Sequence, residues 1–160
     1  MRHTLSVTVE NEPGVLSRVS GLFTGRGFNI ECLNVGPTLD PGVSIMTIST
    51  EGDEQIIEQI VKQLRKLITV IKVVDLTEMK SVLRELVLLK VNANDANRAE
   101  ILRTVDIFRC KVVDVSIDEL TIEAVGNHDK INAIVGLLTR FGIKEISRSG
   151  MVAMKRSMQG

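Results

Sequence analysis

The sequence predicts an α+β protein built from two consecutive βαββαβ units. Apolar residues recur with the two-residue period of a strand and the 3.6-residue period of a helix, in the same order in each half. Residues 77–84, between the halves, form a polar stretch without glycine or proline. A length of 160 residues suits two small domains, and a content of 44% hydrophobic residues is enough for packed cores. We therefore expect one domain at 1–77 and a second at 84–160.

The first unit begins with a strand and a helix. Residues 4–9 alternate between polar and apolar side chains, which is typical of a half-buried strand. A polar turn follows at 10–14, and its Pro13 suits the first position of a helix, where a missing N–H costs nothing. Gly25 and Gly27 would end this helix. Its apolar face comprises Val15, Leu16, Val19, Leu22 and Phe23.

The rest of the first unit is predicted to be two strands, a helix and a closing strand. Residues 28–32 alternate and the phase slips at Leu33 and Val35. Residues 36–42 carry two prolines and two glycines ahead of a second strand at 43–50. Asp53 can cap the helix, and β-branched residues at 70–76 indicate the closing strand. The helix would bury Ile56, Ile57, Ile60, Val61, Leu64 and Leu67.

The second unit repeats the same order. Its strands are predicted at 86–91, 111–115, 120–125 and 141–148. Its helices are predicted at 96–108 and after the cap residue Asn127. The two helices would bury Ile101, Leu102, Val105 and Phe108, and Ile131, Ile134, Val135 and Leu138.

Each unit should fold into a four-stranded antiparallel sheet with both helices on one face, the split βαβ or ferredoxin-like arrangement. The other face would stay uncovered. Because this uncovered face is partly apolar, with Val70, Ile71, Val73 and Val74 assigned to it, we expect sheets or edges of two chains to pair. The sequence therefore predicts at least a homodimer.

Composition argues against two classes of partner. With twenty basic and twenty acidic residues and no Trp or Tyr, the chain lacks both the cationic surface and the stacking platforms of nucleic-acid binders. Its apolar runs are strand-sized, which argues against a membrane span. Residues 1–7 alternate as a strand does and do not resemble a secretion signal, so we expect a cytoplasmic protein.

The residues required for catalysis are sparse. His3 falls in a strand, interpreted as an edge strand, and His128 lies beside a helix cap, so neither suggests a catalytic triad. Cys32 and Cys110 are isolated and are interpreted as small buried hydrophobic residues rather than a disulfide or metal site. A catalytic pair of carboxylates is an alternative that the sequence leaves open, although no particular pair is singled out. We therefore expect a non-catalytic chain without a metal or cofactor of its own.

The turn at residues 10–16 is the most informative segment. Amide groups at a helix start bind anions, and a glycine there lets a ligand carboxylate approach the backbone. Side-chain amide oxygens can accept from an ammonium group, and apolar neighbours can hold an aliphatic side chain. The candidate residues for such an amino-acid site are Asn11, Gly14, Val15, Leu16, Asn29 and Ile30. On chemistry alone, an ordinary loop and helix start explains the same residues.

Residues 2–19, with their Glu-Asn-Glu-Pro-Gly-Val-Leu run, open a series of segments that extends over essentially the whole chain. On these segments the chain resembles the small regulatory subunit of acetohydroxyacid synthase, also called acetolactate synthase. Further segments that fit the family are 21–23, 26–31, 35–38, 46–48, 59–64 and 72–76, then 84–86, 106–109, 112–115, 141–143 and 148–150.

The resemblance implies that the first unit is an ACT domain, an amino-acid-sensing variant of the ferredoxin-like fold. It implies that the chain activates a separate catalytic subunit and confers feedback inhibition by valine. Thiamine diphosphate, FAD and magnesium would belong to that catalytic subunit. Valine would contact Asn11, the amides around Gly14 to Leu16, and Asn29 and Ile30 of a neighbouring protomer. A free-standing ACT-type binding protein and a stand-alone enzyme are the alternatives.

Overall fold

The computed structural model describes residues 1–157. These residues form two compact units, Met1–Val82 together with the chain from Met151 onward, and Leu83–Gly150. The predicted boundary near 77–84 falls close to this division, whereas the described residues after Gly150 group with the first unit. The last three residues of the predicted second domain lie outside the described residues.

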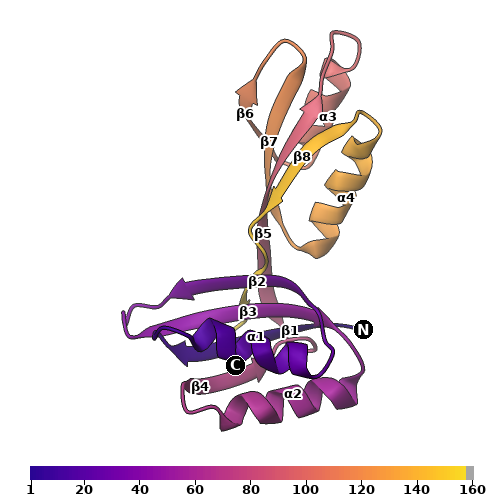
Figure 1. Cartoon of the computed structure of the whole chain (residues 1–160). Helices are drawn as coiled ribbons and strands as arrows, with labels where there is room; N and C mark the ends of the chain where they lie inside the picture. Colours follow the sequence, from indigo (N-terminus) through magenta and orange to yellow (C-terminus); the bar gives the residue numbers. More distant parts are fainter. Residues whose placement is uncertain (158–160) are drawn as a thin grey trace. The chain divides into compact units, whose positions relative to one another are not determined.

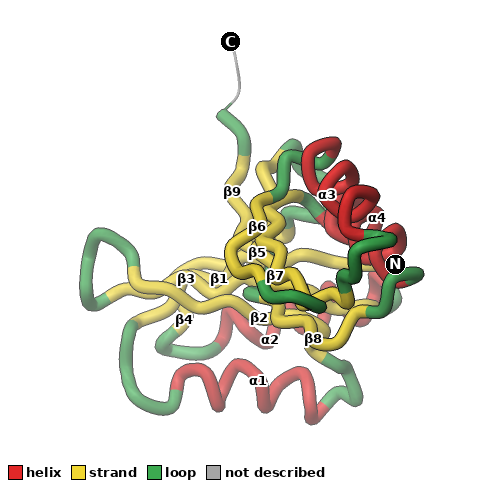
Figure 2. Tube along the Cα trace, turned by 90° about the horizontal axis from the view of Figure 1, so that it is seen from above, coloured by secondary structure: helices red, strands yellow, loops and turns green. Residues whose placement is uncertain are grey.

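The first unit is a four-stranded antiparallel sheet with two helices on one face (Figures 1 and 2). The sheet has the strand order β2-β3-β1-β4. Its elements are β1 (Arg2–Glu10), α1 (Val15–Gly25), β2 (Ile30–Pro37), β3 (Val43–Glu51), α2 (Glu54–Lys66) and β4 (Val70–Asp75). The predicted α+β class and βαββαβ order are therefore confirmed for this unit.

Alternation along β1 explains how the first core forms. Every second residue of β1 is buried, because one face of the strand lies under the two helices. From α1 and α2 the same core receives Val19, Phe23, Ile57 and Leu64. The slip in phase expected at Leu33 and Val35 lies earlier in the structure, where the β2–β3 register shifts between Ile30 and Cys32.

Local signals determine most of the helix ends. The side chain of Asp53 accepts a hydrogen bond from the N–H of Gln55 at 2.9 Å, which confirms it as the cap of α2. Gly27 follows the end of α1 with a φ of 73°, a conformation that favours glycine. The start of α1 differs from the prediction. Pro13 lies in the turn, Gly14 is the N-cap, and the helix begins at Val15.

The second unit repeats the architecture around a core of its own. Its sheet has the order β6-β7-β5-β8, and the side chain of Asn127 caps α4 by accepting from the N–H of Lys130. The elements are β5 (Ser81–Asn92), α3 (Arg98–Ile107), β6 (Lys111–Val115), β7 (Glu119–Gly126), α4 (His128–Thr139) and β8 (Ile143–Arg148). An additional short strand, β9 (Val152–Lys155), pairs with β5 and was not predicted.

Two predictions about individual strand residues are wrong. His3 lies on β1, which has neighbours on both sides, and its side chain is only 3% exposed, so it is not an edge-strand residue. Val73 is buried in the helix-covered core and Val70 packs against it, so neither belongs to the uncovered face. Ile71 does remain 56% exposed. The register of β4 with β1 decides these positions, and that register shifts near Val9.

The two cysteines are free and half-buried, less enclosed than predicted. Cys110 packs against the core of the second unit. Burial raises the pKa of its thiol, and the nearby Lys130 opposes this shift only in part. A protonated, partly enclosed thiol is a poor nucleophile, in keeping with a packing role.

Candidate functional site

The loop between β1 and α1 is held by backbone hydrogen bonds to two other parts of the first unit. The N–H of Glu10 donates to the carbonyl of Thr69 at 2.8 Å, and the N–H of Asn11 donates to the carbonyl of Gly42 at 2.9 Å. The side-chain NH2 of Asn11 donates to the carbonyl of Pro41 at 3.0 Å. Within residues 1–157 the amide oxygen of Asn11 accepts no hydrogen bond, so it can accept one from a ligand ammonium.

The start of α1 offers backbone donors that the described residues do not use. No side chain caps this helix, and the N–H groups of Leu16 and Ser17 have no acceptor within residues 1–157. Of the four helices in the described residues, α1 alone has no acidic residue in its first turn. Its positive helix end is therefore left without a counter-charge from the first turn, a favourable position for an anion.

Gly14 is the residue that keeps this helix start open. Its φ of 86° lies in the left-handed region, where an L side chain is strained. A Cβ built at this position would meet no atom within 4 Å, so the space above the glycine is free for a ligand. Conformation rather than crowding is therefore the reason for glycine here.

The two apolar residues predicted beside the glycine have different environments. Val15 is 3% exposed and belongs to the core, so it can offer a ligand only its backbone. Leu16 is 46% exposed, although the helical pattern assigned it to the buried face. The structure thus leaves Leu16 as the apolar side chain available at the loop.

Asn29 and Ile30 lie at the other end of the same sheet. Glu10 pairs with Val43 on β3, whereas Ile30 pairs with Thr50, seven residues further along the same strand. Seven residues of extended strand span roughly 24 Å. Within one chain the structure therefore brings together Asn11, Gly14, Val15 and Leu16, and does not bring Asn29 and Ile30 to them.

The environments of these two residues also differ from each other. The side chain of Asn29 is exposed, while its backbone carbonyl accepts a hydrogen bond from the Thr50 hydroxyl at 2.7 Å. Ile30 is half-buried and packs against the core of its own unit. Both residues stand at the start of β2, which is an edge strand of the sheet.

Ser17 is a functional candidate that the sequence analysis missed. The helix was expected to begin at Pro13, which would have placed the free amides earlier in the chain. Because the N-cap is Gly14, the second and third helical residues are Leu16 and Ser17, whose N–H groups point out of the helix end. The N-cap position was the missing signal, and it depends on the backbone conformation at Gly14.

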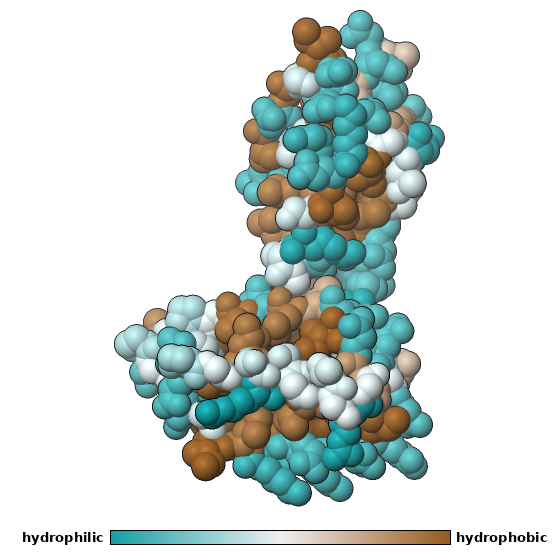
Figure 3. All heavy atoms as spheres, in the orientation of Figure 1, coloured by the Kyte–Doolittle hydropathy of each residue, from teal (hydrophilic) through white to brown (hydrophobic). Residues whose placement is uncertain are grey.

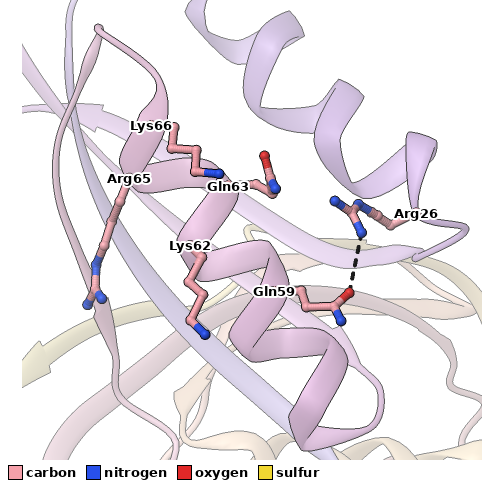
Figure 4. Close-up of a pocket in the computed structure, with 6 residues that line it drawn as sticks. All are labelled: Arg26, Gln59, Lys62, Gln63, Arg65 and Lys66. Carbon is pink, nitrogen blue, oxygen red and sulfur yellow. Dashed lines mark hydrogen bonds between the residues drawn. The ribbon is translucent and has the colours of Figure 1, made fainter.

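A hollow elsewhere on the first unit contains none of the predicted site residues. It has a volume of about 390 Å³ and is lined by Arg26, Gln59, Lys62, Gln63, Arg65 and Lys66 (Figure 4). Its lining is polar and cationic. The spacing of Gln59, Gln63 and Lys66 along one helix face was visible in the sequence, but the approach of Arg26 was not.

Other kinds of site find little support in the described residues. Residues 1–157 contain no group of three or more His, Cys, Asp or Glu side chains arranged to hold a metal ion. No helix in this range is long and apolar enough to cross a membrane.

Two known families match different parts of the chain. A family described as the AHAS small subunit-like ACT domain matches residues 5–72. A second family, described as the small subunit of acetolactate synthase, matches residues 84–157. This chain belongs to the acetolactate synthase small-subunit family.

Similar proteins support the assignment over nearly the full length. A probable acetolactate synthase small subunit from Archaeoglobus fulgidus is 53% identical, with 98% of each chain covered. The acetolactate synthase small subunit of Mycolicibacterium smegmatis is 51% identical, covering 99% of this chain and 93% of the relative. The crystal structure of the small subunit from Thermotoga maritima aligns with a TM-score of 0.88 at 42% identity, covering 99% of both chains.

Membership in this family makes the chain a regulatory small subunit, which implies a catalytic subunit as its partner. The β1–α1 loop and the cationic hollow both lie in the unit matched as an ACT domain. In this small subunit four of the six predicted site residues lie at one end of the first sheet.

Proposed function

We propose that this small subunit raises the activity of the catalytic subunit and makes it sensitive to feedback inhibition by valine. The observation that carries the proposal is the start of α1, where unused amides stand beside the amide oxygen of Asn11 and the open space at Gly14. These groups suit the carboxylate and the ammonium of one amino acid.

Valine would lie across the helix start. Its carboxylate accepts hydrogen bonds from the amides of Leu16 and Ser17, and its ammonium donates to the side-chain oxygen of Asn11. Leu16 offers apolar surface for the isopropyl group because its side chain is half-exposed. The same groups would also accept isoleucine or leucine, so the choice among them depends on the residues that complete the pocket.

A second chain would supply those residues. β2 is an edge strand that runs parallel to β1, because both are antiparallel to β3. Antiparallel pairing of β2 with β2 of the partner subunit would set the start of one strand beside the end of the other. Asn29 of the partner subunit and the partner's Ile30 would then approach the end of the sheet that carries Asn11. We therefore propose a homodimer as the effector-binding form.

The homodimer also provides a physical route to inhibition. A ligand held by two chains stabilises the arrangement in which both sets of residues meet, and the catalytic subunit would respond to that arrangement. A coupling of about 1 to 3 kcal/mol corresponds to a change of roughly 5- to 150-fold in affinity. The chemistry itself would stay on the catalytic subunit, with thiamine diphosphate, FAD and magnesium, and we expect both subunits in the cytoplasm.

The test is a pair of substitutions at Gly14, assayed in the enzyme reconstituted with its catalytic subunit. Gly14→Asp adds a carboxylate where the ligand carboxylate binds, so the valine concentration for half-inhibition should rise at least about tenfold, or about 1.4 kcal/mol. Activation in the absence of valine should persist. Gly14→Asn has the same shape without the charge and also tolerates a positive φ, so it should retain more of the inhibition.

Acetolactate formation from pyruvate, measured across a valine series, distinguishes the outcomes. Full valine sensitivity in Gly14→Asp would show that the loop is not the effector site. Equal loss of inhibition in both variants would indicate backbone strain rather than competition between carboxylates.

A further inference from the structure

The cationic hollow on the first unit, named here the basic groove, has no role in valine binding as proposed. It is defined by Arg26, Gln59, Lys62, Gln63, Arg65 and Lys66. Four of these six side chains are cationic, and no carboxylate lines the groove. In the space-filling view, hydrophilic side chains gather over the solvent side of α2, below the paler surface of α1 (Figure 3).

Two helices build the groove. Arg26 is the C-cap residue of α1, and its guanidinium donates to the side-chain oxygen of Gln59 at 3.3 Å. Gln59, Gln63 and Lys66 follow one another at intervals of four and three residues, so they lie along one face of α2. Figure 4 shows Arg26 on the far side of the groove from this row, with its guanidinium directed toward the two glutamines.

The positive charge of the groove is not neutralised by ion pairs. Within residues 1–157, neither Arg26 nor Lys66 takes part in an ion pair. The nearby carboxylates Glu54, Glu58 and Asp75 line a separate hollow, which Lys62 and Arg65 share with the basic groove. Arg26 and Lys66 are therefore the cations that belong to the groove alone.

Helix dipoles explain part of this arrangement. Arg65 and Lys66 lie in the last turn of α2, where cations are favourable. This effect accounts for Arg65 and Lys66, but it does not account for the approach of Arg26 from α1 to the amide side chain of Gln59 on α2. A glutamate at either 59 or 63 would have neutralised Arg26, whereas glutamine leaves its charge in place and adds N–H donors of its own.

We propose that the basic groove docks an acidic segment of the catalytic subunit. This inference rests on the proposed function only in that the two subunits must associate. Because the chain has no net charge, electrostatic attraction to a partner must come from a local patch, and the groove is such a patch. Arg26 can hold a carboxylate with two N–H groups, and Lys66 can hold a second one.

The location of the groove connects it with the effector loop. α1 begins at the loop and ends at Arg26, and its eleven residues span roughly 16 Å. A shift of the helix start on valine binding would therefore be carried to the groove by one rigid element. The groove itself remains separate from the valine contacts, so substitutions there should weaken docking without changing the effector site.

The experiment measures binding of the full-length chain to the catalytic subunit by isothermal titration calorimetry at about 50 and 200 mM salt. The test variants are Arg26→Gln with Lys66→Gln, and Arg26→Glu with Lys66→Glu. The control is Arg103→Gln with Lys111→Gln, which removes one arginine and one lysine at exposed positions of the second unit. Loss of two charge pairs should weaken docking about tenfold at the lower salt, and charge reversal should weaken it further.

The affinity of the glutamine variant for the catalytic subunit should depend less on salt concentration, because fewer charges are paired in its complex. The control should bind within about twofold of the unchanged chain, and circular dichroism and a valine titration should be unaltered in all variants. Docking of the glutamine variant at unchanged affinity and unchanged salt dependence would overturn the groove assignment. So would an equal loss in the control. Failure of the unchanged chain to bind the catalytic subunit would instead overturn the proposed function, and the groove assignment with it.

Discussion

The first βα loop of each unit occupies the same place in the same topology, but only in the second unit do side chains accept hydrogen bonds from the loop amides. In the first unit, Glu10 and Asn11 donate from the backbone to Thr69 and Gly42. In the second unit, Asn92 and Ala93 donate in the same way to Gly142 and Asp118. The two loops are therefore held against the same neighbouring turns by corresponding backbone hydrogen bonds.

The two loops differ in the hydrogen bonds that side chains form within them. In the second unit the Asn97 side chain accepts from the N–H of Asn94, and the Asn94 side chain accepts from the N–H groups of Ala96 and Asn97. Arg98 donates from its guanidinium to three carbonyls of this region. In the first unit the N-cap is Gly14, which has no side chain to use the loop amides. A shared fold thus does not make a shared binding site, because loop chemistry decides whether ligand-binding groups remain available.

The largest effects should come from removing a buried core side chain from the helix that follows each loop. Phe23→Ala in α1 and Ile101→Ala in α3 each remove a fully buried side chain, at a cost of about 3 to 5 and 2 to 5 kcal/mol. Urea unfolding measures the loss of stability. Valine inhibition should weaken in Phe23→Ala and persist in Ile101→Ala at temperatures where both remain folded. Equal loss of inhibition would contradict the separate roles of the two units.

An intermediate effect is expected from the arginine that fills the second loop. Arg98→Ala leaves three carbonyls without their charged donor, which should lower the free energy of unfolding by about 1.5 to 3 kcal/mol. Thermal unfolding provides the measurement, and Arg98→Lys should restore part of the stability through a single cationic group. Valine inhibition should not change, because this arginine has a structural role.

Smaller effects are expected from replacing one asparagine in each loop, because Asn11 is proposed to bind the ligand whereas Asn97 stabilises its own loop. Asn11→Ala should weaken valine binding about tenfold, or 1.4 kcal/mol, and change stability by less than about 0.5 kcal/mol, because its hydrogen bond to Pro41 is exposed. Asn97→Ala should do the reverse, lowering stability by about 1 kcal/mol with unchanged valine affinity. Calorimetric titration with valine and thermal unfolding of both variants give the comparison. The same pattern in both variants would show that the loops are equivalent.

The smallest effect concerns the thiol of the second unit. Burial raises the pKa of Cys110, so at pH 8 a smaller fraction is thiolate than in an ordinary free thiol. Cys110, observed in a Cys32→Ser variant, should therefore react with a disulfide reagent more slowly than free cysteine, and its rate should keep rising as the pH increases past the pKa of a free thiol. A rate equal to that of free cysteine at pH 8 would contradict the burial of this residue.

Local patterns predicted much of the fold. The alternation along β1, the caps Asp53 and Asn127 and the terminating Gly27 each depend on residues within a few positions of one another, and all were confirmed. The start of α1 was predicted too early in the chain, because proline is compatible both with the first helical position and with the turn before it. The positive φ at Gly14 decided between them.

The candidate site could be predicted only in its local part. Asn11, Gly14 and Leu16 are close in sequence, and the structure keeps them together. The unused N–H group of Ser17 could be predicted only by knowing that Gly14 is the N-cap of α1. The position of Asn29 and Ile30 at the far end of the sheet required the register of two strand pairs.

By itself the sequence determined the element order, the two similar units, most helix ends and the local half of the amino-acid loop. These features follow from periodicity and capping, which act over less than two helical turns. Only the tertiary structure placed His3 inside the sheet, paired β9 with β5 and brought Arg26 to Gln59, thirty-three residues apart in the chain. Periodicity specifies which face of an element is buried, but neighbours and register are chosen by packing between distant segments.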